Sequence, residues 1–123
     1  MKKILVIEDN LIVRNTVTRI LQTAGYTVVT ANDGLQGFEM FRKERPDLVI
    51  SDIIMPQQEG IGTIRQILAE RPGTKIIAIS GGGRIGNTDF LQIARKVGAT
   101  EVLPKPFDPD DLLQLVLNCL KVA

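Results

Sequence analysis

Three carboxylates, one hydroxyl and one lysine each follow a short apolar run of the chain. They are Glu8 and Asp9 after 4–7, Asp52 after 48–50, Ser80 after 75–79, and Lys105 after 101–103. Carboxylates that crowd together repel one another and raise one another's pKa unless a cation joins them. Magnesium prefers oxygen ligands and suits a site built from a few carboxylates. If the fold brings these residues together, we therefore expect them to hold Mg²⁺.

The same residue types can carry out phosphoryl transfer. Magnesium would neutralise oxygens of an incoming phosphoryl group while Lys105 and the Ser80 hydroxyl contact the others. An aspartate then remains as the nucleophile, and an aspartyl phosphate is a known product of carboxylate chemistry. The sequence contains no histidine. That absence excludes Ser-His-Asp hydrolysis, His-ligated zinc and phosphohistidine chemistry on this chain.

The spacing of apolar residues predicts the elements that position this chemistry. Apolar runs typical of buried strands lie at 4–7, 27–31, 48–50, 75–79 and 101–103. The segments between them carry helical spacing, weakest in the second segment, around Phe38 and Phe41. Strands that alternate with helices predict an α/β fold, a five-stranded parallel sheet in an open, doubly wound domain. In such sheets ligands bind at the carboxyl ends of the strands, which is where the five polar residues lie.

Residues at the expected helix ends agree with this pattern. Gly25 and Gly98 follow helical segments where a left-handed cap is favoured, and Pro72 stops the third helix. We interpret the carboxylates that precede helices as helix caps and not as site residues; they are Asp33, Asp108, Asp110 and Asp111.

Composition limits the possible function classes. The 123 residues suit one domain, expected to span 1–123, and 44% hydrophobic with 24% charged residues is a globular balance. The net charge of +1 lacks the excess of positive charge that is typical of proteins that bind nucleic acid or an anionic membrane, so neither is an expected partner. A lone cysteine, Cys119, suits a reducing compartment, and the four-residue apolar run near the N-terminus is too short for a signal peptide. We therefore expect a cytoplasmic protein.

Together these motifs resemble the receiver domain of two-component response regulators. The resemblance rests on Glu8-Asp9, on Asp52-Ile53-Ile54-Met55-Pro56, on Ser80 and on Lys105-Pro106, and it covers the whole chain. It implies a flavodoxin-like fold with strand order 2-1-3-4-5 and a cis peptide between Lys105 and Pro106, a bond type essentially confined to X-Pro.

The resemblance also implies a role for each site residue. Asp52 would accept the phosphoryl group, and Ser80 and Lys105 would grip it. Mg²⁺ would be bound by Glu8, Asp9, Asp52 and the backbone carbonyl of Ile54. The donor would be a sensor histidine kinase or a histidine phosphotransfer protein, and the chain would be a stand-alone signalling switch rather than an enzyme. Its downstream protein target would bind the face formed by the fourth helix, fifth strand and fifth helix.

This chain departs from the usual receiver pattern in three places. Val102 stands where many receivers carry a Tyr or Phe that moves with the hydroxyl residue. Ser80 replaces the commoner threonine. The run Gly81-Gly82-Gly83 predicts a mobile connection that carries the conformational change in place of the aromatic.

The last helix carries two apolar stripes. One is Leu113, Val116, Leu117 and Leu120, and the other is Leu112, Leu115 and Cys119. We expect one stripe to pack on the sheet. The other either faces a partner or is covered by a neighbouring helix.

Other functions remain as alternatives to the switch. Val102 leaves open a phosphate-independent receiver-like interaction module. A haloacid-dehalogenase-type phosphatase would need a second aspartate where Ile54 stands, and an FMN site would need hydroxyls where Glu8-Asp9 would repel the phosphate. Both enzyme hypotheses therefore fail on the residues present.

Overall fold

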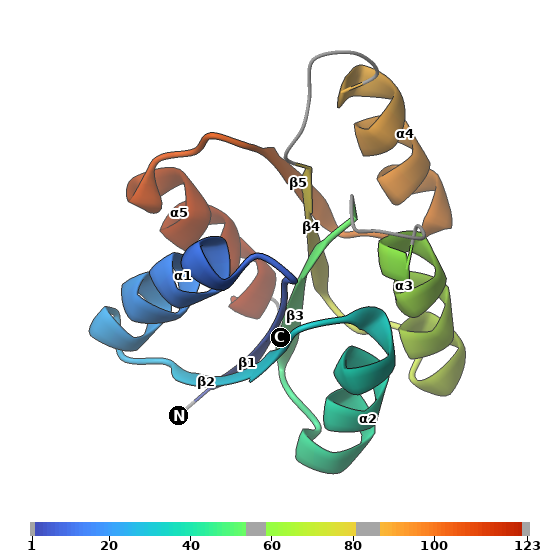
Figure 1. Ribbon diagram of the computed structural model, residues 1–123, viewed down its shortest axis with the longest axis horizontal. Helices are drawn as coiled ribbons and strands as arrows, with labels where there is room; N and C mark the ends of the chain where they lie inside the picture. The colour runs from blue at the N-terminus through green and yellow to red at the C-terminus, as the bar shows by residue number, and fades with distance from the viewer. Residues whose placement is uncertain (1, 54–58, 81–86, 122–123) are drawn as a thin grey trace.

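In the computed structural model, the described residues form five strands and five helices that alternate along the chain (Figure 1). The strands are β1 (Lys3–Ile7), β2 (Thr27–Ala31), β3 (Leu48–Asp52), β4 (Ile76–Ser80) and β5 (Glu101–Pro104). The helices are α1 (Leu11–Thr23), α2 (Gly34–Glu44), α3 (Glu59–Glu70), α4 (Asn87–Val97) and α5 (Pro109–Leu120). The structure describes residues 2–53, 59–80 and 87–121, and their side chains except at 59–60, 80 and 87–91.

The strands form one parallel sheet in the order β2-β1-β3-β4-β5, which confirms the predicted fold class and strand order. Ile7 at the end of β1 is in register with Ala31 of β2 and with Ser51 of β3. The carboxyl ends of the strands therefore meet at one edge of the sheet. That edge is where the sequence places its polar residues.

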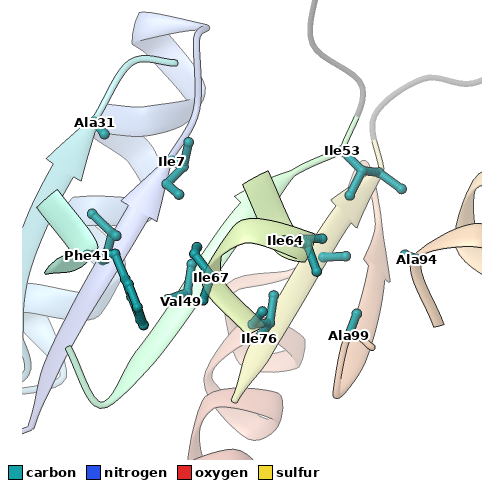
Figure 2. Close-up of a cluster of buried hydrophobic side chains, with 12 residues drawn as sticks. Ile7, Ala31, Phe41, Val49, Ile53, Ile64, Ile67, Ile76, Ala94 and Ala99 are labelled. Carbon is teal, nitrogen blue, oxygen red and sulfur yellow. The ribbon is translucent and has the colours of Figure 1, made fainter. Parts of the chain in front are cut away.

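Helices cover both faces of the sheet, as a doubly wound fold requires. Side chains alternate along β1, so that Ile4 and Val6 face one core cluster while Leu5 and Ile7 face the other. The first cluster lies under α1 and α5, and the second, shown in Figure 2, lies under α2, α3 and α4. Because both faces are buried, the strands are almost continuously apolar.

Local signals fix the helix ends. Gly25 and Gly98 have φ of 99° and 117°, which confirms the predicted left-handed caps. The Asp33 side chain caps α2 by accepting a hydrogen bond from the Gln36 amide at 2.7 Å. Asp108 occupies the N-cap position of α5 and Pro109 follows it, but the Asp108 side chain makes no capping hydrogen bond. In the described part of the chain, no helix has the length and apolar character needed to cross a membrane.

The buried face of α5 includes one predicted apolar stripe and part of the other. Leu112 and Val116 are completely buried and Cys119 nearly so, whereas Leu117 is about half exposed at 49%. Residues 112, 116 and 119 follow i, i+4, i+7 spacing, so one side of the helix packs on the core. The partly buried Leu113, Leu115 and Leu120 pack against the same cluster. The prediction that one stripe packs on the sheet is confirmed by Leu112, Leu115 and Cys119. The other stripe packs there in part, and Leu117 is its exposed member.

The packing at Gly98 gives a stability prediction. A Cβ at this position would overlap the Cδ1 of Leu68, whereas a Cβ at Gly25 would have no atom within 4 Å. Both glycines have positive φ, so Gly25→Ala is expected to lose roughly 1–2 kcal/mol from backbone strain alone. Gly98→Ala must also displace the terminal methyl group of the partly buried Leu68, so we expect it to lose about 1 kcal/mol more, the low end of overpacking costs. Urea denaturation of the two variants measures the difference, and equal losses would show that the Leu68 contact is relieved without cost.

Candidate phosphoryl-transfer and cation site

Two buried carboxylates lie at the carboxyl edge of the sheet. Asp52 is the last residue of β3 and Glu8 follows β1, and their exposed fractions are only 4% and 2%. The amide of Glu8 extends the β1–β2 pairing by donating to the carbonyl of Ala31 at 3.0 Å. Because β1 lies between β2 and β3, and Ile7 is in register with Ser51, the next residue, Glu8, lies near the end of β3. The fold thus confirms that Glu8 and Asp52, which are far apart in sequence, converge.

Asp9 completes an acidic cluster with these two residues. One carboxylate oxygen from each of Glu8, Asp9 and Asp52 lies within 4.8 Å of the others, and Asp9 is the exposed member. A set of three carboxylates suits a hard cation such as Mg²⁺, which keeps part of its water shell. The donor chemistry of these residues therefore fits the expected metal.

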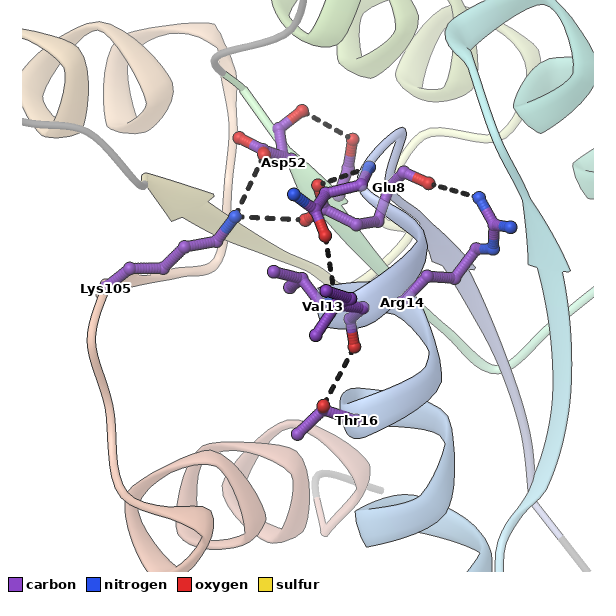
Figure 3. Close-up of polar contacts among 9 residues, drawn as sticks. Glu8, Val13, Arg14, Thr16, Asp52 and Lys105 are labelled. Atoms are coloured by element: carbon purple, nitrogen blue, oxygen red, sulfur yellow. Dashed lines mark hydrogen bonds and ion pairs between the residues drawn. The ribbon is translucent and has the colours of Figure 1, made fainter.

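Lys105 connects the two buried carboxylates. Its Nζ donates to Asp52 Oδ2 at 3.1 Å and to Glu8 Oε1 at 3.2 Å, as Figure 3 shows. The following bond, Lys105–Pro106, is cis as predicted. A single ammonium therefore compensates part of the negative charge at this edge.

Burial sets the protonation of this cluster. Burial and the nearby Asp52 carboxylate raise the pKa of Glu8 from 4.5 to about 7, against the opposing effects of Lys105 and the Asn10 amide. Burial alone would lower the pKa of Lys105, but the carboxylates of Asp52 and Glu8 outweigh it and raise that pKa. Near neutral pH, Lys105 therefore stays charged while Glu8 carries a proton in part of the population.

The loop between β1 and α1 is anchored by two residues that the sequence analysis did not single out. Asn10 donates its amide N–H to Glu8 Oε2 at 3.2 Å, and its side chain caps α1 by accepting from the Val13 amide at 3.0 Å. The guanidinium of Arg14 donates to the backbone carbonyl of Glu8 at 3.0 Å. An asparagine before a helix is a recognisable cap signal. No sequence signal indicates the Arg14 contact, which depends on how α1 meets the loop.

The other predicted site residues have different outcomes. The backbone of Ser80 ends β4, opposite Pro104 of β5, but its side chain lies outside the described residues. Ile54 and the run 81–83 also lie outside them. Val102 is partly buried and packs against the core cluster under α2, α3 and α4.

Comparison with known proteins decides the family. A family model described as the response regulator receiver domain matches residues 4–117. The chain belongs to this family. It is 31% identical over 122 residues to a chemotaxis protein CheY of Listeria monocytogenes, covering 98% of this chain and 100% of that protein. It is 30% identical to sporulation initiation phosphotransferase F of Bacillus subtilis, covering 97% of this receiver and 94% of that protein.

Solved receiver structures agree with this assignment. A response regulator receiver domain protein from Clostridium thermocellum superposes with a TM-score of 0.90 at 31% identity, covering 98% of this chain and 95% of that one. The acidic cluster and Lys105 therefore occur within a receiver fold.

Proposed function

We propose that this receiver accepts a phosphoryl group on Asp52 in a Mg²⁺-dependent reaction. The observation that carries the proposal is the position of the Asp52 carboxylate, which is nearly buried, is bonded by Lys105 and lies beside Glu8 and Asp9. Glu8, Asp9 and Asp52 would hold the metal together with the Ile54 carbonyl. The bound ion would supply positive charge to the phosphoryl oxygens.

The chain's own residues account for the rest of the reaction. A carboxylate oxygen of Asp52 attacks phosphorus and forms the new P–O bond of an acyl phosphate. The P–N bond of a donor phosphohistidine breaks, and its electron pair stays on the imidazole nitrogen. Lys105, whose Nζ already lies 3.1 Å from Asp52 Oδ2, contacts an oxygen of the transferred group, and the Ser80 hydroxyl contacts another.

We further propose that the donor is a sensor histidine kinase or a histidine phosphotransfer protein. Two relatives support a signalling role, since their names are chemotaxis protein CheY and sporulation initiation phosphotransferase F. The phosphorylated form would then bind another protein through the face of α4, β5 and α5. On this proposal the chain is a phosphoacceptor in signalling, and it does not bind nucleic acid directly.

Two further proposals concern its extent and compartment. We propose that residues 1–123 act as a single receiver unit, because the family model covers residues 4–117 and the CheY relative matches 98% of the chain. We propose the cytoplasm as its compartment, because the buried Cys119 is a free thiol and free thiols suit reducing conditions.

Incubation with a small phosphodonor tests the proposed function. With acetyl phosphate and Mg²⁺, intact mass spectrometry should show the gain of one phosphoryl group, and a chelator should prevent it. Because some receivers resist small donors, a negative result is repeated with phosphorylated histidine kinases. If neither kind of donor phosphorylates the protein, the proposal of a phosphorylation switch is overturned. It would favour the phosphate-independent interaction module that Val102 leaves open.

A further inference from the structure

Arg14 is the residue of α1 that reaches back to the acidic loop. Its Nη1 donates a hydrogen bond of 3.0 Å to the backbone carbonyl of Glu8 in a partly buried position. Figure 3 shows the guanidinium extending from α1 to this carbonyl and away from Lys105, which approaches the cluster from the other side. The proposed reaction gives Arg14 no direct role.

The bonded carbonyl lies in the peptide that joins Glu8 to Asp9. A peptide unit is planar, so rotation of this plane moves the start of Asp9 as well as the carbonyl. Glu8 has other constraints, because its amide donates to Ala31 and its carboxylate accepts from Lys105 and from the Asn10 amide. The exposed carboxylate of Asp9 accepts no hydrogen bond from any residue in the described ranges. Its position therefore depends on the backbone that carries it.

The bonds around this peptide form one connected unit with the first turn of α1. The Arg14 amide donates to the Asn10 carbonyl at 2.9 Å, and the Asn10 side chain accepts from Val13. Arg14 therefore holds the loop at two points, through its own amide at Asn10 and through its guanidinium at Glu8. Only the guanidinium contact depends on the side chain.

We propose that Arg14 is a positioning residue for the cation site. Its guanidinium fixes the Glu8–Asp9 peptide, so that the Asp9 carboxylate faces Glu8 and Asp52. This inference rests on the proposed function, because it takes Mg²⁺ as the ligand. Residues that orient metal ligands through hydrogen bonds, without binding the metal themselves, typically contribute 10–100-fold to metal affinity.

Electrostatics alone predicts the opposite effect, which makes the proposal testable. A guanidinium near three carboxylates repels a divalent cation, so its removal should tighten Mg²⁺ binding if charge were its only influence. Loss of a positioning contact should weaken binding instead. The direction of the change therefore separates the two roles.

The test compares Mg²⁺ affinity in three variants by isothermal titration calorimetry. Arg14→Met keeps the aliphatic stem but removes the donor, and we expect it to bind Mg²⁺ about tenfold more weakly than wild type. Arg14→Lys keeps a charged donor and should recover part of the loss. Arg19→Met is the matched control, since Arg19 is an exposed residue of the same helix, and it should bind Mg²⁺ as tightly as wild type or more tightly.

A second measurement examines the free protein. The amide NMR resonance of Asp9 should shift in Arg14→Met without Mg²⁺ and should stay in place in Arg19→Met. Wild-type affinity or tighter binding in Arg14→Met would overturn the positioning role, and a loss in Arg14→Lys as large as in Arg14→Met would count against it too. If wild type itself binds no Mg²⁺, the proposed function fails, and this inference fails with it.

Discussion

Replacement of Lys105 by methionine is expected to slow phosphorylation of Asp52 about 100-fold. This is a typical loss of rate when an enzyme loses one hydrogen-bond donor to the negative charge that develops in the transition state. Lys105 donates to both buried carboxylates and would contact the transferred group. The variant should nevertheless bind Mg²⁺ as tightly as wild type or more tightly, because the ammonium competes with the ion for the same oxygens.

Rates with acetyl phosphate, followed by intact mass at saturating Mg²⁺, provide the measurement for Lys105→Met. Lys43→Met is a suitable control, since Lys43 is exposed near the end of α2, at the opposite edge of the sheet. Its rate should equal that of wild type. An unchanged rate in Lys105→Met would remove Lys105 from the reaction, and a parallel loss of Mg²⁺ affinity would assign it to the metal site instead.

Replacement of Glu8 by glutamine is expected to stabilise the metal-free protein at pH 8 by about 2 kcal/mol. Burial raises the pKa of Glu8 to about 7, and at 1.36 kcal/mol per pKa unit that shift corresponds to about 3 kcal/mol. Part of this gain is offset because glutamine loses the ionic bond from Lys105. The same substitution should weaken Mg²⁺ binding at least tenfold, because it removes a carboxylate ligand and even changes behind the ligands typically cost 10–100-fold in metal affinity.

The pH dependence of stability follows from the same carboxyl. The folded protein keeps a proton on Glu8 that the unfolded chain releases between pH 4.5 and about 7. The folded state therefore binds more protons in this window, so the free energy of unfolding should fall as pH rises through it. Saturating Mg²⁺ should restore stability at pH 8 because the ion binds the ionised carboxylates of the folded state.

Urea denaturation from pH 4.5 to 8 checks both expectations for Glu8. The fall in the free energy of unfolding with rising pH should disappear in Glu8→Gln. It should persist in the control variant Glu39→Gln, because Glu39 is exposed on α2. A Glu8→Gln protein less stable than wild type at pH 8 without metal would show that the Lys105 bond outweighs the cost of burying the carboxylate.

The sequence predicts the convergence of the site because that convergence depends on topology. Apolar runs locate the strands, and parallel connections place every strand end at one edge. Glu8, Asp9, Asp52 and Lys105 follow those ends, and the structure brings all four together. The cis bond before Pro106 was also predicted, through the resemblance to receivers.

Features that depend on the packing angle of one element could not be predicted in this way. The core contacts of α5 include Val116 of the second predicted stripe as well as Leu112 and Cys119, because the neighbours of that helix set how far it rolls onto the sheet. The bond from Arg14 to the Glu8 carbonyl likewise depends on the position of α1 relative to the loop. The pKa of Glu8 follows from its burial, which only the assembled fold defines.

Chemical trapping of the phosphorylated residue tests the central claim most directly. Borohydride reduces an aspartyl phosphate to homoserine, and peptide mass spectrometry then identifies the position. After phosphorylation in Mg²⁺, homoserine should occur at residue 52 in wild type and at no position in Asp52→Asn. Homoserine at residue 9 in wild type, or undiminished phosphorylation of Asp52→Asn, would contradict the assignment of Asp52 as the acceptor.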